Sequence, residues 1–190
     1  MKKMTGTHQL IHRILAREAT IGVIGLGYVG LPLVLRFCEE KFHVLGFDVD
    51  PNKVAKLKKG TSYLKSIPSS QISPFVRTGR LDVTDDFSRL SESDCILICV
   101  PTPLTEKMEP DLQYIEKTTE AILHSLRKGQ LIVLESTTYP GTTEELLLPR
   151  LESTGFKAGK DFFLGFSPER EDPGHPEYRG KHNKRGHRTG

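Results

Sequence analysis

Long apolar runs are absent from this 190-residue chain. No stretch approaches the roughly 18 apolar residues that a membrane-spanning helix requires, and the opening Met-Lys-Lys-Met-Thr-Gly lacks the apolar segment of a signal peptide. Cysteine is also rare: the chain has three, and their positions show no paired spacing. Few, unpaired cysteines favour a reducing compartment over a disulfide scaffold. We therefore expect a cytoplasmic protein that does not contact a membrane.

A strong charge of either sign is missing as well. The formal net charge is +3, but residues 181–190 hold four Lys or Arg and no acid, and the rest of the chain has 23 basic and 24 acidic residues. The body of the protein therefore has no electrostatic bias toward nucleic acid. We expect the tail over residues 175–190 to be disordered, because its last ten residues have nothing apolar to bury; a nucleic-acid-binding tail is the functional alternative.

What the chain does have is a G-x-G-x-x-G run directly after an apolar, strand-like segment. Gly25 would permit a tight turn, Gly27 would let the backbone approach a pyrophosphate, and Gly30 would let the next helix pack on the strand. The phosphates would lie against free N–H groups in the first turn of that helix. The cofactor-binding residues predicted here are Gly25, Gly27, Tyr28, Val29 and Gly30. The alternative is an ordinary strand-to-helix turn, but the context favours a dinucleotide site.

An acidic residue follows at the spacing that such a site requires. Asp48 ends the next strand-like segment, 18 positions after Gly30, where a carboxylate could accept hydrogen bonds from the adenosine ribose. A carboxylate there favours NAD over NADP, whose 2′-phosphate it would repel. Asp50 is a competing candidate, although Pro51 after it suggests that Asp50 caps a helix.

Strand-like and helix-like segments alternate along the chain. Strands are expected at 20–25, 43–49, 81–83, 94–100, 130–135 and 161–166, and helices at 9–18, 30–40, 51–59, 111–127 and 142–154. The alternation predicts an α/β fold, a Rossmann-type doubly wound parallel sheet in the order 3-2-1-4-5-6, with ligands at the carboxyl ends of the strands.

One domain is expected, with an appendage at each end. Residues 1–19 would form a helical extension, residues 20–174 the NAD-binding domain and residues 175–190 the tail. In the extension, an apolar face at helical spacing comprises Leu10, Ile11, Ile14 and Leu15.

Five ordered motifs lie at the expected strand ends. They are Gly-Leu-Gly-Tyr-Val-Gly-Leu-Pro at 25–32, Gly-Phe-Asp-Val-Asp at 46–50, Val-Pro-Thr-Pro-Leu at 100–104, Glu-Ser-Thr-Thr-Tyr-Pro-Gly-Thr-Thr at 135–143 and Phe-Ser-Pro-Glu-Arg-Glu-Asp-Pro-Gly at 166–174. Together they resemble the N-terminal domain of the UDP-glucose/GDP-mannose dehydrogenase family, and most of all its bacterial UDP-N-acetylglucosamine 6-dehydrogenases. The resemblance covers about residues 8–174.

The resemblance implies a reaction and further site residues. The family oxidises the C6 alcohol of a nucleotide sugar twice, with two NAD, through an aldehyde and an enzyme-bound thioester. It implies that Lys53 meets the adenosine ribose and that Thr102 and Thr137 lie beside the cofactor. Glu169 would contact the sugar and assist thioester hydrolysis as a general base, and Arg170 would contact the substrate. The family also implies a possible homo-oligomer.

Each motif has a plainer alternative. Pro101-Thr102-Pro103 could simply end a strand, and Ser136 and Thr138 could only cap a turn. The charged run that contains Glu169 and Arg170 could be a solvated turn.

The family's nucleophilic cysteine, in a later substrate-binding half, has no counterpart here. Cys38, Cys95 and Cys99 are instead expected to pack as small hydrophobes. After Gly174 the family pattern stops, which suggests a truncation with a frame-shifted end. Two other functions stay open: a noncatalytic NAD-binding protein, and a small two-electron hydroxy-acid dehydrogenase. The second would need a lysine or histidine as proton acceptor, whereas His124 and Lys128 are expected on or beyond the 111–127 helix, away from the strand ends.

Overall fold

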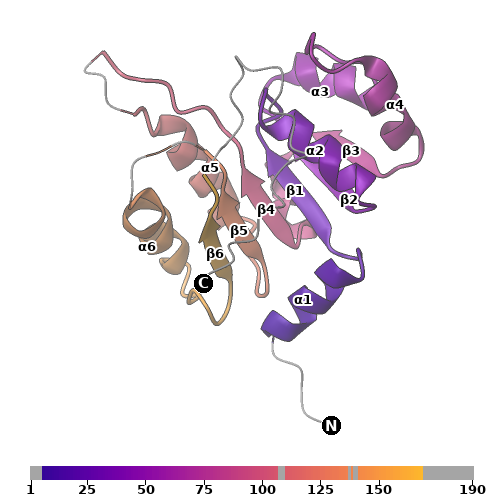
Figure 1. Cartoon of the computed structure of the whole chain (residues 1–190). Helices are drawn as coiled ribbons and strands as arrows, with labels where there is room; N and C mark the ends of the chain where they lie inside the picture. The colour runs from indigo at the N-terminus through magenta and orange to yellow at the C-terminus, as the bar shows by residue number, and fades with distance from the viewer. Residues whose placement is uncertain (1–5, 107–109, 137, 139–140, 169–190) are drawn as a thin grey trace, which may run out of the picture.

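The chain folds around one parallel sheet with helices on both faces. The computed structural model describes residues 6–106, 110–136, 138 and 141–168. Its six strands lie in the order β3-β2-β1-β4-β5-β6, and every neighbouring pair is parallel (Figure 1). The predicted fold class and strand order are confirmed.

The elements begin and end close to the predicted positions. The strands are β1 Thr20–Ile24, β2 His43–Phe47, β3 Leu81–Thr84, β4 Cys95–Ile98, β5 Leu131–Leu134 and β6 Phe163–Phe166. The α-helices are α1 Gly6–Leu15, α2 Gly30–Glu39, α3 Pro51–Lys58, α4 Ser69–Arg77, α5 Gln113–Leu123 and α6 Leu148–Glu152, with a 3-10 helix at Phe87–Glu92 and a π-helical turn at Thr143–Leu147.

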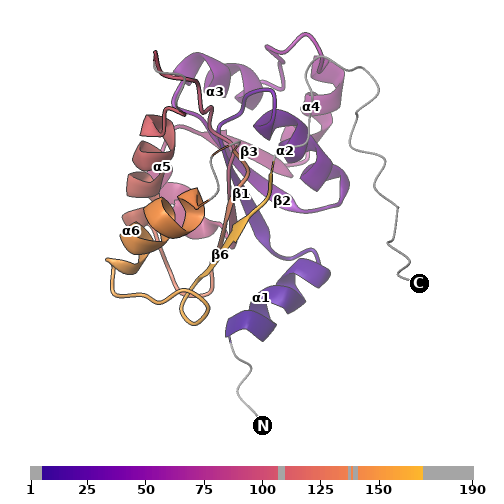
Figure 2. The same cartoon turned by 60° about the vertical axis from the view of Figure 1, so that its left-hand side comes forward.

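Two apolar clusters fill the two faces of the sheet. Alternate side chains of one strand enter different clusters: Ile21 and Val23 of β1 join one, and Ile24 joins the other. Helices α2 and α4 lie on one side and α5 and α6 on the other (Figure 2). The strand order reverses between β1 and β4, so the chain leaves these two strands toward opposite faces of the sheet. A crevice therefore opens at their carboxyl ends.

Helix α1 lies below the amino ends of the strands (Figure 1). Only half of its predicted apolar face is covered: Leu10 is buried and Ile14 packs on the core, whereas Ile11 is 49% exposed and Leu15 is 74% exposed. The predicted helix is present, and its apolar face is covered only in part. Leu10 and Ile14 form one i, i+4 pair, which contacts the body of the protein. Ile11 and Leu15 form the neighbouring pair, which is exposed.

Asp94 fixes this end of the molecule. Its carboxylate is buried and accepts hydrogen bonds from the Thr20 N–H at 2.8 Å, from Arg127 Nη2 at 2.8 Å and from Arg13 of α1. One side chain thus joins α1, the start of β1 and the loop before β5.

Three predicted helices differ from those observed. Helix α1 begins and ends three residues before the predicted 9–18. Helix α5 begins two residues late, after an Asp111 carboxylate that accepts the Gln113 N–H at 3.0 Å, and it ends at Leu123, four residues before the predicted end. The predicted helix at 142–154 is a π-helical turn followed by the short α6, with Pro149 near the junction. Proline lacks the N–H that a regular helix needs at that point, so the turn widens.

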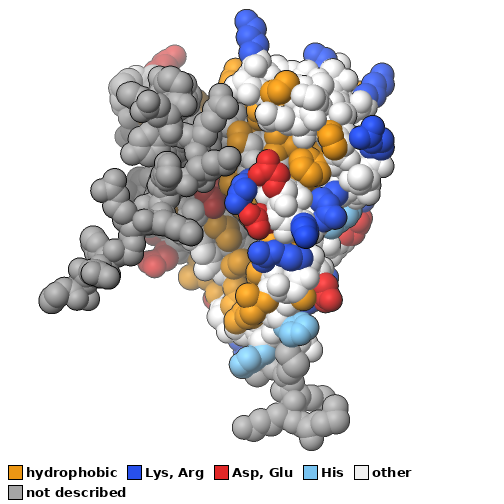
Figure 3. All heavy atoms as spheres, turned by 45° about the vertical axis from the view of Figure 1, so that its right-hand side comes forward, with side chains coloured by type: hydrophobic (Ala, Val, Ile, Leu, Met, Phe, Trp, Pro, Cys, Tyr) orange, Lys and Arg blue, Asp and Glu red, His pale blue; other side chains and the backbone are white. Residues whose placement is uncertain are grey.

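The charges on the surface are mixed in sign. On the face in Figure 3, Lys and Arg side chains lie among Asp and Glu side chains. On the outer surface of α2, Arg36 pairs with Glu39 at 3.0 Å and with Glu40 at 2.6 Å. In the described ranges, no helix has the length and apolar character that crossing a bilayer would take.

Candidate functional site

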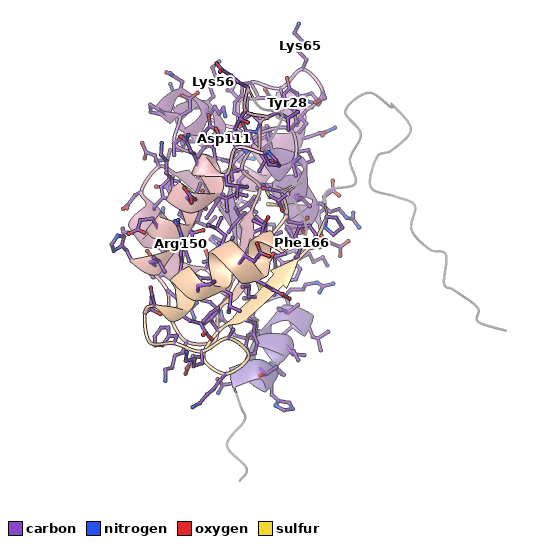
Figure 4. The ribbon with its side chains drawn as sticks, turned by 90° about the vertical axis from the view of Figure 1, so that its left-hand side faces the viewer. Tyr28, Lys56, Lys65, Asp111, Arg150 and Phe166 are labelled. Carbon is purple, nitrogen blue, oxygen red and sulfur yellow. The ribbon has the colours of Figure 1, made fainter. Side chains whose placement is uncertain are left out.

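A cleft of about 840 Å³ opens at the carboxyl ends of β1 and β4. Tyr28 and Asp111 lie toward this end of the molecule, away from α1 (Figure 4). The cleft is lined by Ile24, Gly25, Gly27, Tyr28, Val29, Asp48, Val49, Lys53, Phe87, Cys99, Val100, Pro101, Thr102, Tyr114, Lys117, Thr118, Ala121, Glu135 and Ser136. The structure therefore brings together every predicted cofactor residue that it describes except Gly30, which lies directly behind the turn.

The three glycines of the turn meet different surroundings. Gly25 has a φ of +91°, and a Cβ there would lie 2.7 Å from the carbonyl oxygen of Cys99. A Cβ on Gly30 would lie 1.9 Å from the carbonyl oxygen of Gly25, so no side chain fits between helix and strand. A Cβ on Gly27 would meet nothing within 4 Å. Two glycines are thus required by the packing of the protein itself, and the third keeps a space open.

Helix α2 begins at this turn without a polar cap. Val29 is the capping residue, and no side chain accepts a hydrogen bond from the helix start. Backbone N–H groups at the start of a helix attract anions when no side chain satisfies them. The turn therefore suits a phosphate group.

Asp48 connects the end of β2 to the glycine turn. Its side chain is 6% exposed, and Oδ2 accepts the Leu26 N–H at 3.0 Å and lies 3.3 Å from Lys53 Nζ. Oδ1 accepts the Asp50 N–H at 3.0 Å. Asp48 lines the cleft, with a remaining acceptor capacity that a ribose hydroxyl could use.

Asp50 is the N-terminal cap of α3. Its carboxylate accepts the Asn52 N–H at 2.8 Å and caps α3, with Pro51 in the first turn. The prediction that Asp50 is a helix cap is confirmed, and Asp50 does not line the cleft.

The far wall of the cleft comes from β4 and β5. Thr102 and Ser136 both line it. Ser136 Oγ donates to the carbonyl oxygen of Val100 at 2.7 Å, and so holds the two strand ends together. Thr137, Glu169 and Arg170 lie outside the described residues, so their predicted roles stay predictions.

The three cysteines are buried, and neither His124 nor Lys128 lies in the lining of the cleft. Burial raises the pKa of the Cys38 and Cys95 thiols to about 12. Cys99 lines the cleft but is only 7% exposed. His124 lies beside Glu120 and Lys128 beside Asp161, and neither lines the cleft, in agreement with their expected position away from the strand ends.

Helix α5 supplies a wall that motif reading missed. Tyr114, Lys117, Thr118 and Ala121 all line the cleft. Their i, i+3, i+4, i+7 spacing is the sequence signal that could have identified this face, since such residues share one side of a helix.

The fold and the site together define a dinucleotide-binding domain of the Rossmann type. A sequence model described as "UDP-glucose/GDP-mannose dehydrogenase family, NAD binding domain" matches residues 19–188, and the chain belongs to that family. The family and the cofactor NAD were both predicted and are confirmed.

Known relatives extend well beyond this chain. UDP-N-acetyl-D-glucosamine 6-dehydrogenase of Pseudomonas aeruginosa is 37% identical over 164 residues, which are 86% of this chain and 38% of that protein. The structure of UDP-D-ManNAc dehydrogenase from Pyrococcus horikoshii superposes with a TM-score of 0.76 at 35% identity, over 82% of this chain and 37% of that one. The structure of GDP-mannose dehydrogenase from Pseudomonas aeruginosa superposes with a TM-score of 0.75 at 33% identity, over 79% of this chain and 36% of that one. The chain thus spans somewhat more than a third of their length.

Proposed function

We propose that this chain is the NAD-holding part of a nucleotide-sugar 6-dehydrogenase that acts on UDP-N-acetylglucosamine. The observation that carries the proposal is the single cleft that joins the glycine turn, Asp48 and the ends of β4 and β5. The choice of sugar follows the 37% identity to the Pseudomonas aeruginosa UDP-N-acetyl-D-glucosamine 6-dehydrogenase.

In this proposal the turn from Gly25 to Gly30, including the N–H groups of Tyr28 and Val29, holds the pyrophosphate of NAD. The space beside Gly27 fits a group that must approach the backbone closely. Asp48 accepts hydrogen bonds from the adenosine ribose, and Lys53 approaches the same ribose while neutralising the carboxylate. Thr102 and Thr137 orient the nicotinamide side.

When bound, NAD accepts a hydride from the alcohol carbon. The protein residues position the two partners and exclude water from the cleft. We assign Glu169 to the sugar contact and to general-base assistance during thioester hydrolysis, and Arg170 to a further substrate contact, because both match the family motif.

We propose that these 190 residues bind NAD but do not complete the oxidation. Two of the three cysteines are held as neutral thiols by burial, which raises the pKa of each to about 12, and a thiolate is the reactive form. A cytoplasmic location and assembly into a homo-oligomer belong to the same proposal for the whole protein.

Calorimetric titration with NAD, followed by an NADH-absorbance assay, tests these points. We expect binding of NAD, weaker binding of NADP, and no NADH formation with UDP-N-acetylglucosamine. Turnover would overturn the assignment of inactivity, and a preference for UDP-N-acetylmannosamine in that turnover would overturn the choice of sugar. An absence of NAD binding would overturn the proposed function.

A further inference from the structure

Leu26, inside the glycine turn, is held from three directions. Its side chain is fully buried, and its methyl carbons lie 3.1 Å from where a Cβ on Gly46 of β2 would be. Its N–H donates to Asp48, and its carbonyl oxygen accepts a hydrogen bond from the hydroxyl of Tyr63. The Leu26 backbone therefore has a bonded partner on each side of the residue.

Fixing the Leu26 carbonyl also fixes the next N–H. The described peptide bonds are all trans, and in a trans peptide the carbonyl and the following N–H point in opposite directions. With the Leu26 oxygen directed at Tyr63, the Gly27 N–H is directed away from Tyr63. Gly27 lines the cleft beside the open space.

We propose that Tyr63 is a positioning residue for the pyrophosphate of the cofactor, because its hydroxyl locks the Leu26–Gly27 peptide in one orientation. This inference rests on the proposed placement of the pyrophosphate at the glycine turn. Without the lock, the peptide could rotate, and the N–H groups of the turn would have to be ordered when the ligand binds.

The surroundings of Tyr63 suit it to this role. Ser62 and Ser69 brace its loop, since Ser69 Oγ accepts the Ser62 N–H at 2.9 Å and Ser62 Oγ accepts the Leu64 N–H at 3.1 Å. Lys53 Nζ lies 5.8 Å from the centre of the Tyr63 ring. Burial, and then the nearby carboxylates of Asp48 and Asp50, raise the pKa of Tyr63, so its hydroxyl keeps the proton that it donates.

The test compares Tyr63→Phe with the unaltered 190-residue chain. The variant keeps the ring and removes only the hydroxyl. Calorimetry gives the Kd for NAD, ADP and adenosine. Losing one preorganising hydrogen bond should raise the Kd for NAD and for ADP by roughly threefold to tenfold. Adenosine, which has no phosphate, should bind as before. Thr78→Val is the matched control, because it removes a hydroxyl that donates to the Pro74 carbonyl at 2.9 Å in α4, away from the turn.

A second readout needs no ligand. In the free protein, the ¹⁵N–¹H resonance of Gly27 should shift or broaden in Tyr63→Phe and stay unchanged in Thr78→Val. Unchanged affinity for ADP, or an equal loss for ADP and adenosine, would overturn the positioning role, and so would an unchanged Gly27 resonance. If the unaltered chain failed to bind NAD, the proposed function would fall, while the Gly27 resonance would still report whether Tyr63 fixes the peptide.

Discussion

Asp48 Oδ2 and the Leu26 N–H lie 3.0 Å apart, so a carboxylate at the end of β2 bonds directly to the turn that follows β1. The residue proposed to select the cofactor is therefore also part of the frame that shapes the phosphate site. A substitution of Asp48 should therefore weaken the binding of both the ribose and the pyrophosphate. An acid that only contacted the ribose would affect ribose binding alone.

Asp48→Asn should weaken NAD binding by roughly tenfold, because the amide loses the charge and part of the acceptor capacity that Leu26, Asp50 and the ribose would share. Binding of NADP should suffer less, since a negative charge near its phosphate disappears. Calorimetric Kd values for both cofactors check this. Asp50→Asn is the control, because Asn is an equally good helix cap and NAD affinity should stay within about twofold. Equal losses in the two variants would contradict the choice of Asp48.

Gly27→Ala and Gly25→Ala should fail in different ways. At Gly27 the methyl group enters open space, so we expect an unchanged Tm and a clear loss of NAD affinity. At Gly25 the φ of +91° and the 2.7 Å approach of the Cys99 carbonyl would strain the backbone, so the Tm should fall. Thermal melts and NAD titration distinguish the two; a destabilised Gly27→Ala would contradict the idea that its space is reserved for a ligand.

Asp94→Ala should destabilise the protein without changing NAD affinity. The substitution leaves Arg13, Arg127 and the Thr20 N–H without their shared acceptor. We expect a loss of roughly 3 kcal/mol in the free energy of unfolding, the low end for a broken buried ion pair, because both arginines are partly exposed. Urea unfolding and NAD titration check the two parts. A large change in NAD affinity would show that the two ends of the sheet are coupled.

Stability should decline in mild alkali because of the buried thiols. Burial raises the pKa of Cys38 and Cys95 from 9.0 to about 12. The folded state keeps both thiols neutral, so their contribution is complete below pH 9 and is lost as the pH rises toward about 12. Urea unfolding at pH 7, 9 and 10 measures the decline, with the Cys38→Ala, Cys95→Ala double variant as the comparison. An identical pH profile in that variant would contradict this cause.

The sequence predicts most of the fold because its signals are local. The turn at Gly25, the cap at Asp50 and the buried run of β4 each depend on neighbours within a few residues, and the structure has all three. The partners of Leu26 were not predictable in this way, because Tyr63 reaches it from a loop 37 positions away. The half-covered face of α1 depends likewise on a tertiary contact that periodicity does not specify.

Central strand β1 is tied by a carboxylate at each end. Asp94, at the start of β4, accepts the N–H of Thr20, where β1 begins, and Asp48, at the end of β2, accepts the N–H of Leu26 just beyond it. The two acids come from the neighbours on either side of β1. Sliding β1 by one residue along either neighbour would break a charge-assisted bond as well as the ladder. Two carboxylates, one from each neighbouring strand, therefore fix the position of the glycine turn relative to the sheet.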